Sequence, residues 1–343
     1  MNRLPPPRGP LSAFLVAHLA REPHRLPSCT PPSAAALTDD DLNLALYCCY
    51  ELHYRGFAEV SESWEWHPGL LSFRAGLEDA FLARVIEAVG GPGPVGDTAG
   101  ELAALLARGN GPSLSAYMAE HGSLQQFREF ALHRSAYQLK EADPHTWAIP
   151  RLDGEAKAAL VEIQADEYGL GRCGQMHATL FAGTMRRLGL DPEYGAYLRF
   201  IPGVTLATVN LVSLFGLHRR WRGALLGHLA VFEMASVVPN TRYGDALRRL
   251  GFGPDATTFY DVHVQADALH EVIAQHRLAG EFSAANPDRA GDVLFGARAL
   301  MAVEERFTRR LLDAWAAGRS SLYADQPFGL APLAPSRDAL AVH

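Results

Sequence analysis

The chain has 343 residues, of which 48% are hydrophobic and 20% are charged, and its formal net charge is −7. A chain of this length can bury a large core, and an acidic balance without any run of lysine and arginine argues against nucleic acid as a partner. Because no apolar stretch approaches the roughly 18 residues of a membrane span, we expect no membrane association either.

The N-terminus and the cysteines both indicate a cytoplasmic protein. A short apolar run occurs near the N-terminus, but prolines surround it, a histidine interrupts it and no small-residue cleavage site follows, which is not the pattern of a signal peptide. The cysteines form no C-x-x-C pair, so we expect reduced thiols and neither disulfides nor a zinc site. They are Cys29, Cys48, Cys49 and Cys173.

Helical patterns cover most of the chain. Residues 1–37 are rich in proline and alanine and predict an irregular arm. Residues 38–123 predict an N-terminal helical region, which begins at Thr38 with three aspartates in the first turn. The clearest linker, GGPGPVG, lies within this region at residues 90–96.

Residues 124–318 predict a second helical domain, and residues 319–343 a loose tail. We find no alternating strand pattern and no internal repeat, so the predicted fold class is all-α. The predicted helices cover residues 42–57, 70–90, 101–108, 113–120, 123–141, 153–168, 174–189, 203–236 with a break near 218–222, 239–250, 255–277 and 288–317.

The segment GLGRCG, residues 169–174, spells the G-x-G-x-x-G of a dinucleotide-binding turn. That turn requires a strand before it, a helix after it and a βαβ unit around it. The preceding VEIQADEY predicts a helix, and no parallel sheet is expected to receive the turn. We therefore interpret the match as a coincidence and not as a phosphate site.

A later segment, FYDVHVQADALHEVIAQH, is compatible with a metal site. At 100° per residue, His263, Asp267 and His270 fall within about 60° on one face of a helix. Imidazole and carboxylate ligands suit a first-row metal, iron or manganese in particular. The alternative is a solvated face that carries two histidines by chance.

Two further residues have an unusual setting for their chemistry. Glu233 lies in the almost wholly apolar LLGHLAVFEMASVVPN, and burying a bare carboxylate costs several kcal/mol unless it is paired or bound to metal. His177 lies in the similarly apolar MHATLFAGTM. The alternatives are an ion pair between Glu233 and Arg242, and a core histidine bonded to the backbone. Inward carboxylates and imidazoles on several helices are also how bundles hold two metals.

These residues together resemble the haem-oxygenase-like diiron oxidases and oxygenases. In that family a glutamate and a histidine come from early core helices, a glutamate from a middle helix, and H-x-x-x-D-x-x-H from a late one. The intervals here are similar to those of an N-oxygenating member, which also places a carboxylate on an earlier helix. The resemblance implies these metal ligands: Glu141, Glu167, His177, Glu233, His263, Asp267 and His270.

Ten residues separate Glu167 from His177, which does not bring them to one face of a regular helix. We therefore expect the glycines of GLGRCG to break the helix and act as a hinge between the two ligands. Glu162 and Asp166 are competing carboxylates nearby, and we rank both below Glu141 and Glu167.

The resemblance implies a haem-oxygenase-like helical bundle that binds two iron ions per chain and activates O₂ to oxidise a small molecule. An external electron donor is compatible with this chemistry. Among N-oxygenation, C–C cleavage and desaturation, the ligand intervals favour N-oxygenation of an amine. The alternative functions are a metal-free oxidase or small-molecule binding protein of the same fold, and a purely structural helical protein.

The N-terminal helical region predicts a layer that buries aromatic side chains against the core or a second chain. Its aromatic residues are Tyr47, Tyr50, Tyr54, Trp64 and Trp66. Because the linker at 90–96 separates this layer from the predicted iron-binding domain, we expect a homodimer.

Overall fold

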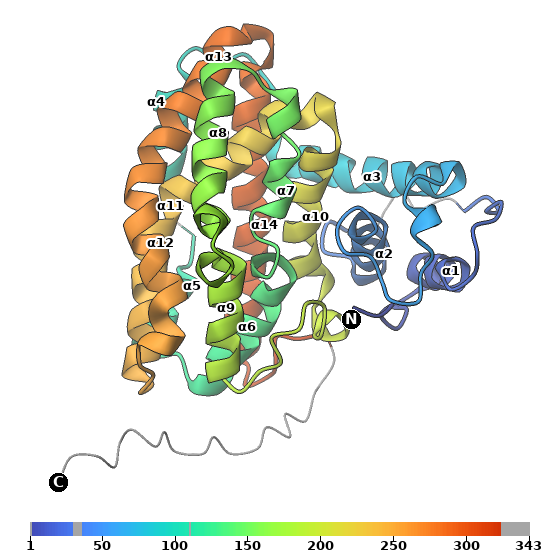
Figure 1. Ribbon diagram of the computed structural model, residues 1–343, viewed down its shortest axis with the longest axis horizontal. Coiled ribbons are helices and arrows are strands. Elements are labelled where there is room, and N and C mark those ends of the chain that lie inside the picture. Colours follow the sequence, from blue (N-terminus) through green and yellow to red (C-terminus); the bar gives the residue numbers. More distant parts are fainter. Residues whose placement is uncertain (1, 30–35, 110, 324–343) are drawn as a thin grey trace.

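The computed structural model describes residues 2–29, 36–109 and 111–323 (Figure 1). Helices make up nearly all regular structure in these residues, and no strand occurs among them. The predicted all-α class is therefore confirmed. Within the described part of the chain, no helix is both long and apolar enough to cross a membrane.

The long helices run side by side and form a bundle (Figure 1). Helix α11 lies at its centre and packs against both α12 and α14. The bundle helices are α6 (Leu124–Gln138), α8 (Gly154–Glu167), α9 (His177–Arg187), α10 (Gly203–Leu217), α11 (Arg222–Arg249), α12 (Pro254–Val272) and α14 (Ala290–Ala316). Every residue from 223 to 231 on α11 is buried, which places Glu233 just beyond a fully buried stretch of the core.

Helix α11 corrects the prediction of two separate helices over 203–236 and 239–250. The first predicted helix does break, after Leu217, but α11 then runs without interruption through Pro239. An internal proline removes one backbone hydrogen bond and disfavours a helix. Packing against helices on several sides of α11 outweighs that local preference.

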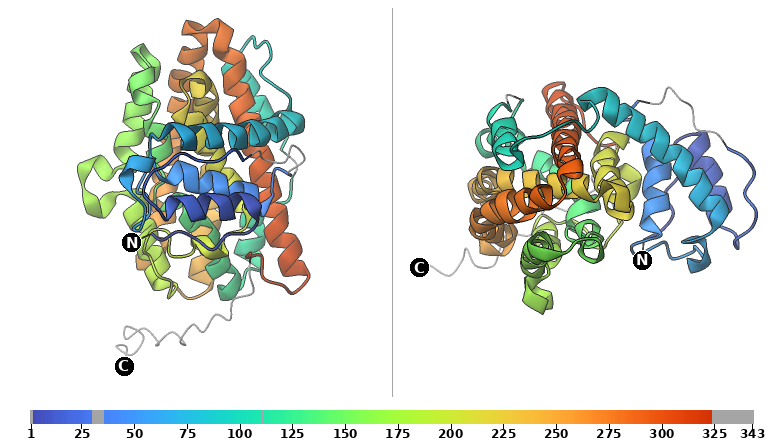
Figure 2. Two further views of the ribbon diagram at one scale, coloured as in Figure 1. Left: turned by 90° about the vertical axis from the view of Figure 1, so that its right-hand side faces the viewer. Right: turned by 90° about the horizontal axis from the view of Figure 1, so that it is seen from above.

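Three N-terminal helices lie across the direction of the bundle and form a layer beside it (Figure 2). They are α1 (Pro10–Leu19), α2 (Asp40–Glu51) and α3 (Pro68–Val89). Helix α2 packs against α10, and α3 reaches α14. The sequence predicted an irregular arm over residues 1–37, so α1 was missed. Its first turn is capped from another helix, because the carboxylate of Asp41 accepts from the backbone of Leu11 and Ser12 at 2.8 Å each.

A buried ion pair joins the layer to the bundle. Lys140 Nζ lies 3.0 Å from Glu51 Oε2, and the two side chains are 1% and 0% exposed. The hydroxyl of Tyr194 also donates to Glu51 Oε2, at 2.6 Å. The ammonium group lies 4.1 Å from the centre of the Tyr54 ring. The layer is therefore attached to the bundle at the residue that precedes Glu141.

Most of the aromatic residues of the layer pack within this one chain. Tyr47, Tyr50 and Trp64 are buried, whereas Trp66 remains 63% exposed. The hydroxyl of Tyr54 donates to Ser213 on α10 at 3.1 Å. The homodimer remains a prediction, and in this structure Trp66 is the aromatic residue that a second chain would find exposed.

The remaining helices pack on the bundle. Helices α4 (Thr98–Ala107) and α5 (Leu114–Glu120) pack on the bundle helices α11 and α14 and on a π-helical segment, Ile273–Gly280, that continues α12. The short helix α7 (Asp143–Thr146) packs on α10, and α13 (Glu281–Ala285) packs on the π-helical segment.

Candidate metal centre

Two neighbouring groups of acidic and imidazole side chains lie inside the bundle. Within each group the candidate ligand atoms lie within 4.8 Å of one another, and Glu167 belongs to both groups. A carboxylate has two oxygens, so a shared glutamate is suited to bridge two metal ions. The groups are Glu141, Glu167, His177 and His263, and Glu167, Glu233 and His270.

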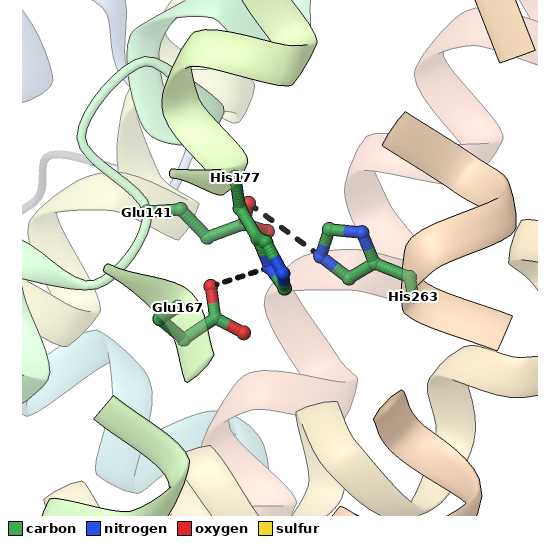
Figure 3. A group of neighbouring side chains, drawn as sticks. All are labelled: Glu141, Glu167, His177 and His263. Carbon is green, nitrogen blue, oxygen red and sulfur yellow. Dashed lines mark ion pairs between the residues drawn. The ribbon is translucent and has the colours of Figure 1, made fainter. Parts of the chain in front are cut away.

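The first group draws its four side chains from the segment after α6 and from α8, α9 and α12 (Figure 3). His177 Nδ1 lies 2.9 Å from Glu167 Oε2, and His263 Nε2 lies 3.7 Å from Glu141 Oε2. The centres of the two imidazole rings lie 4.3 Å apart, and the ring planes are tilted by 51° to each other. All four side chains therefore converge on one small volume.

The glycine segment between Glu167 and His177 produces this convergence. Glu167 is the last residue of α8 and His177 is the first of α9, and two short 3₁₀ turns lie between them. Gly169, Leu170 and Gly171 all have positive φ, at 60°, 51° and 78°. This run interrupts the helix between α8 and α9, which follow one another along the bundle (Figure 1), and it lets residues ten positions apart meet. The segment that spells a dinucleotide turn is the hinge between two candidate ligands.

The two glycines of the hinge give a matched pair of variants. A Cβ at Gly169 would lie 2.5 Å from the backbone carbon of Gln175, whereas a Cβ at Gly171 would meet no atom within 4 Å. We expect Gly171→Ala to cost about 1–2 kcal/mol for its left-handed backbone and to keep the site. Gly169→Ala must also move the segment that leads into His177.

Metal titration by calorimetry, with thermal unfolding alongside, measures both effects. Gly169→Ala is expected to lose at least tenfold in iron(II) affinity, and Gly171→Ala to retain wild-type affinity. Equal affinities in the two variants would show that the hinge does not set the position of His177.

His263 is held in a fixed orientation by its own helix. Its Nδ1 lies 2.7 Å from the carbonyl oxygen of Phe259, one turn earlier, and donates to it. The other ring nitrogen, Nε2, then carries the lone pair and faces Glu141. Histidines that bind metals are commonly oriented by such a bond from the second nitrogen.

The second group surrounds His270, which is fully buried. Glu233 Oε2 lies 3.2 Å from its Nδ1, and Asp166 Oδ2 lies 2.9 Å from its Nε2. Burial lowers the pKa of His270, but the contacts with Glu233 and Asp166 outweigh burial and raise it to about 9. The imidazole is therefore protonated at neutral pH without metal, and a cation would take the place of that proton.

The two carboxylates of the first group differ in their electrostatic surroundings. Burial raises the pKa of Glu141, and the imidazole of His263 offsets only part of this effect. Burial also raises the pKa of Glu167, but the close approach of His177, with the charges of His263 and His270, outweighs it and lowers that pKa. The shared carboxylate is thus the one that its neighbours keep ionised.

The donor set fits metal ions better than it fits a network of hydrogen bonds. Glu141 Oε2, Glu167 Oε2 and His177 Nδ1 are buried and form no hydrogen bond with any described residue. The last two atoms lie 2.9 Å apart without the geometry of a hydrogen bond. Buried polar atoms that approach a common position without hydrogen bonds between them are arranged as metal ligands. Oxygen and imidazole donors suit iron or manganese.

The structure changes three details of the predicted ligand set. His263 and His270 lie about two helical turns apart on α12 and belong to the two different groups, so they do not face a single point. The side chain of Asp267, between them on α12, lies outside the described residues. Asp166, which the sequence ranked below its neighbours, contacts His270.

The sequence offered Glu162 as a competing carboxylate and Arg242 as an ion-pair partner for Glu233, and both form other contacts. Glu162 forms an ion pair with Arg277 at 2.6 Å on the exposed side of α8. Arg242 donates to Ser113 at 3.3 Å. Glu233 instead contacts His270, as the metal interpretation requires.

A cavity of about 860 Å³ opens onto both groups. Glu141, Glu167, Glu233 and His263 form part of its wall, and residues from α4, α5 and α14 form its outer part. A volume of this order holds a compact organic molecule. Asn240, a possible pocket residue from its sequence context, also lines this cavity, whereas the sequence did not point to Gln138, His145 or Gln164, which share the wall with the ligands.

Comparisons with known proteins agree with the geometry. The model of a family described as iron-containing redox enzyme matches residues 128–305, more than half of the chain. Nitrosourea synthase from Streptomyces achromogenes subsp. streptozoticus is 28% identical over 141 residues, which is 41% of this chain and 30% of that protein. The similarity therefore extends over less than a third of the relative's length.

Proposed function

Because this chain belongs to the family of iron-containing redox enzymes, we propose that it is a non-haem diiron oxygenase that uses O₂ to oxidise a small metabolite. The observation that carries the proposal is the carboxylate of Glu167, which is shared between two groups of buried ligands. A shared carboxylate between two His-containing groups is the arrangement by which helical bundles hold a pair of iron ions.

The side chains described above have distinct roles in this proposal. Glu141, His177 and His263 would hold one ion, Glu233 and His270 the other, and Glu167 would bridge them. Asp166 would orient His270 from its second nitrogen. Bound iron(II) supplies the electrons that begin the reduction of O₂. The cavity beside Glu141 and Glu233 would hold the substrate and exclude bulk water.

N-oxygenation is the reaction that we prefer. An N–H group, O₂, two electrons and two protons give an N–OH group and water, and an external reductant supplies the two electrons. The ligand intervals support this choice, as does the partial similarity to a protein named for making a nitrosourea, a compound that contains an N–N=O group. We also propose that the substrate is compact, since the cavity lies inside a bundle.

The proposal predicts O₂ consumption by protein loaded anaerobically with iron(II). We expect uptake of O₂ that scales with bound iron and is nearly abolished in Glu233→Ala, because that variant removes the carboxylate that belongs to the second group alone. An oxygen electrode with parallel metal analysis makes the measurement. Glu162→Ala is the control, since Glu162 is an exposed carboxylate on α8 that pairs with Arg277.

Iron that is bound but inert toward O₂ would reject the oxygenase and favour a binding protein. If the wild-type protein binds no iron at all, the metal-free oxidase becomes the better explanation.

A further inference from the structure

The wall of the cavity contains a buried hydrogen-bond acceptor that does not belong to any candidate metal ligand. Gln164 lies on α8 one turn before Glu167, is 3% exposed, and lines the cavity beside the candidate metal centre. Its Oε1 atom is buried and accepts no hydrogen bond from any residue that the structure describes. Leaving a buried acceptor without a donor costs about 1–3 kcal/mol, so a donor is expected there in the working protein.

The orientation of the Gln164 amide is fixed by its other end. Nε2 donates to the carbonyl oxygen of Ala142 at 2.8 Å and to Oγ1 of Thr146 at 2.7 Å. A backbone carbonyl can only accept, so the amide cannot be reversed without placing two acceptors against each other. Tyr168, which lies 2.9 Å from Thr146 Oγ1 and donates to Asp143, extends this network. Oε1 is therefore fixed as a buried acceptor on a side chain that lines the cavity.

A second glutamine has a similar position, although no hydrogen bond in the described part of the chain fixes the orientation of its amide. Gln138 lies three residues before Glu141, lines the same cavity, and its Oε1 is also buried without a hydrogen bond to any described residue. Both glutamines precede a candidate ligand in the pattern Gln-x-x-Glu, as QLKE at 138–141 and QADE at 164–167. Each pair consists of a candidate metal ligand and an amide three residues earlier. Two amide oxygens accompany the two carboxylates of the first group.

We infer that Gln164, assisted by Gln138, selects a substrate whose reacting end carries N–H donors, such as a primary amine or a related nitrogen group. The inference rests on the proposed function and narrows it. Two amide oxygens accept from N–H groups and oppose a carboxylate, which has no hydrogen to donate. A fatty acid or other substrate that presents a carboxylate to the iron would leave both acceptors unsatisfied. The amide contacts would also hold the nitrogen atom beside Glu141 and Glu167.

Three probes of similar size separate hydrogen-bond donation from charge. They are n-butylamine, which carries N–H donors, n-butyltrimethylammonium, which carries charge without them, and pentanoate, which carries the opposite charge. Calorimetry or ligand-detected NMR on the protein loaded anaerobically with iron(II) gives the affinities. We expect n-butylamine to bind at least tenfold more tightly than n-butyltrimethylammonium.

Gln164→Leu is expected to lower the affinity for n-butylamine about tenfold, which corresponds to one good hydrogen bond, and to leave the affinities for the other two probes unchanged. Gln138→Leu is expected to act in the same direction with a smaller effect. Gln275→Leu is the matched control, because the Gln275 amide donates to Ala99 at 2.9 Å and does not line the cavity. The iron content of all three variants should match that of the wild type.

The outcomes separate this inference from the proposed function. Suppose first that iron binds. The selection of N–H donors is then wrong if Gln164→Leu lowers the affinity for all three probes equally or for none of them, or if the amine fails to bind at millimolar concentration. The diiron oxygenase stands in each of these cases. If the wild-type protein binds no iron, the proposed function fails. The three probes on the metal-free protein then still decide whether Gln164 distinguishes N–H donors.

Discussion

Replacing Glu167 by alanine is expected to remove both bound metal ions, whereas replacing His263 or His270 is expected to remove mainly one. Glu167 is the only described side chain that belongs to both ligand groups, while each of these histidines belongs to one. Loss of a residue that only orients a ligand already costs 10–100-fold in metal affinity. Loss of a ligand to both ions should exceed that factor at each site.

Elemental analysis after anaerobic loading with iron(II) and removal of excess metal tests this ordering. Wild-type protein should hold two irons per chain, His263→Ala and His270→Ala about one, and Glu167→Ala close to none. Glu162→Ala provides the control on the same helix and should hold two. Helical circular dichroism must be preserved in every variant. Two irons retained by Glu167→Ala would contradict the bridging role.

Replacing Lys140 by methionine is expected to give the largest loss of stability that a single substitution outside the metal centre produces. The change leaves the carboxylate of Glu51 buried without its cation, at a site where both side chains are at most 1% exposed. Removing one partner of a buried ion pair costs about 3–5 kcal/mol. The phenol of Tyr194 still donates to Glu51, so we expect the lower half of that range.

Denaturant unfolding of the metal-free protein gives this free energy. The double variant Lys140→Met, Glu51→Leu should recover most of the loss, because it removes the uncompensated charge as well. Arg309→Met is the comparison, since Arg309 pairs with Glu305 on the exposed face of α14. It is expected to change the stability little. A loss in Lys140→Met no larger than that of Arg309→Met would show that the pair does not hold the layer to the bundle.

The sequence predicted those features that depend on local patterns. Apolar periodicity placed the bundle helices within a few residues of their bounds, and Asp39 caps α2 within one residue of the expected start. The apolar surroundings of Glu233 and His177 identified them because an acid or an imidazole in such a setting needs a partner. The side chains of both lie in the ligand groups.

The features that the sequence did not predict depend on contacts between distant segments. Helix α1 is capped by Asp41, about 30 residues away, and no local pattern in a proline-rich stretch reveals such a cap. Asp166 and Glu167 are adjacent acids at the end of a helix, and only the path of the hinge shows that both face imidazoles. The spacing of Gln164 and Glu167 can be read from the sequence, but the hydrogen bonds that fix the Gln164 amide depend on the fold.

The buried pair between Lys140 and Glu51 also bears on which part of this chain can be produced alone. The segment that matches the family model begins at residue 128 and contains Lys140, but Glu51 lies outside it. A fragment limited to the matched region would carry a buried ammonium group without its counter-ion, and the face of α10 that α2 covers would meet water. We therefore expect such a fragment to be less stable than the full chain.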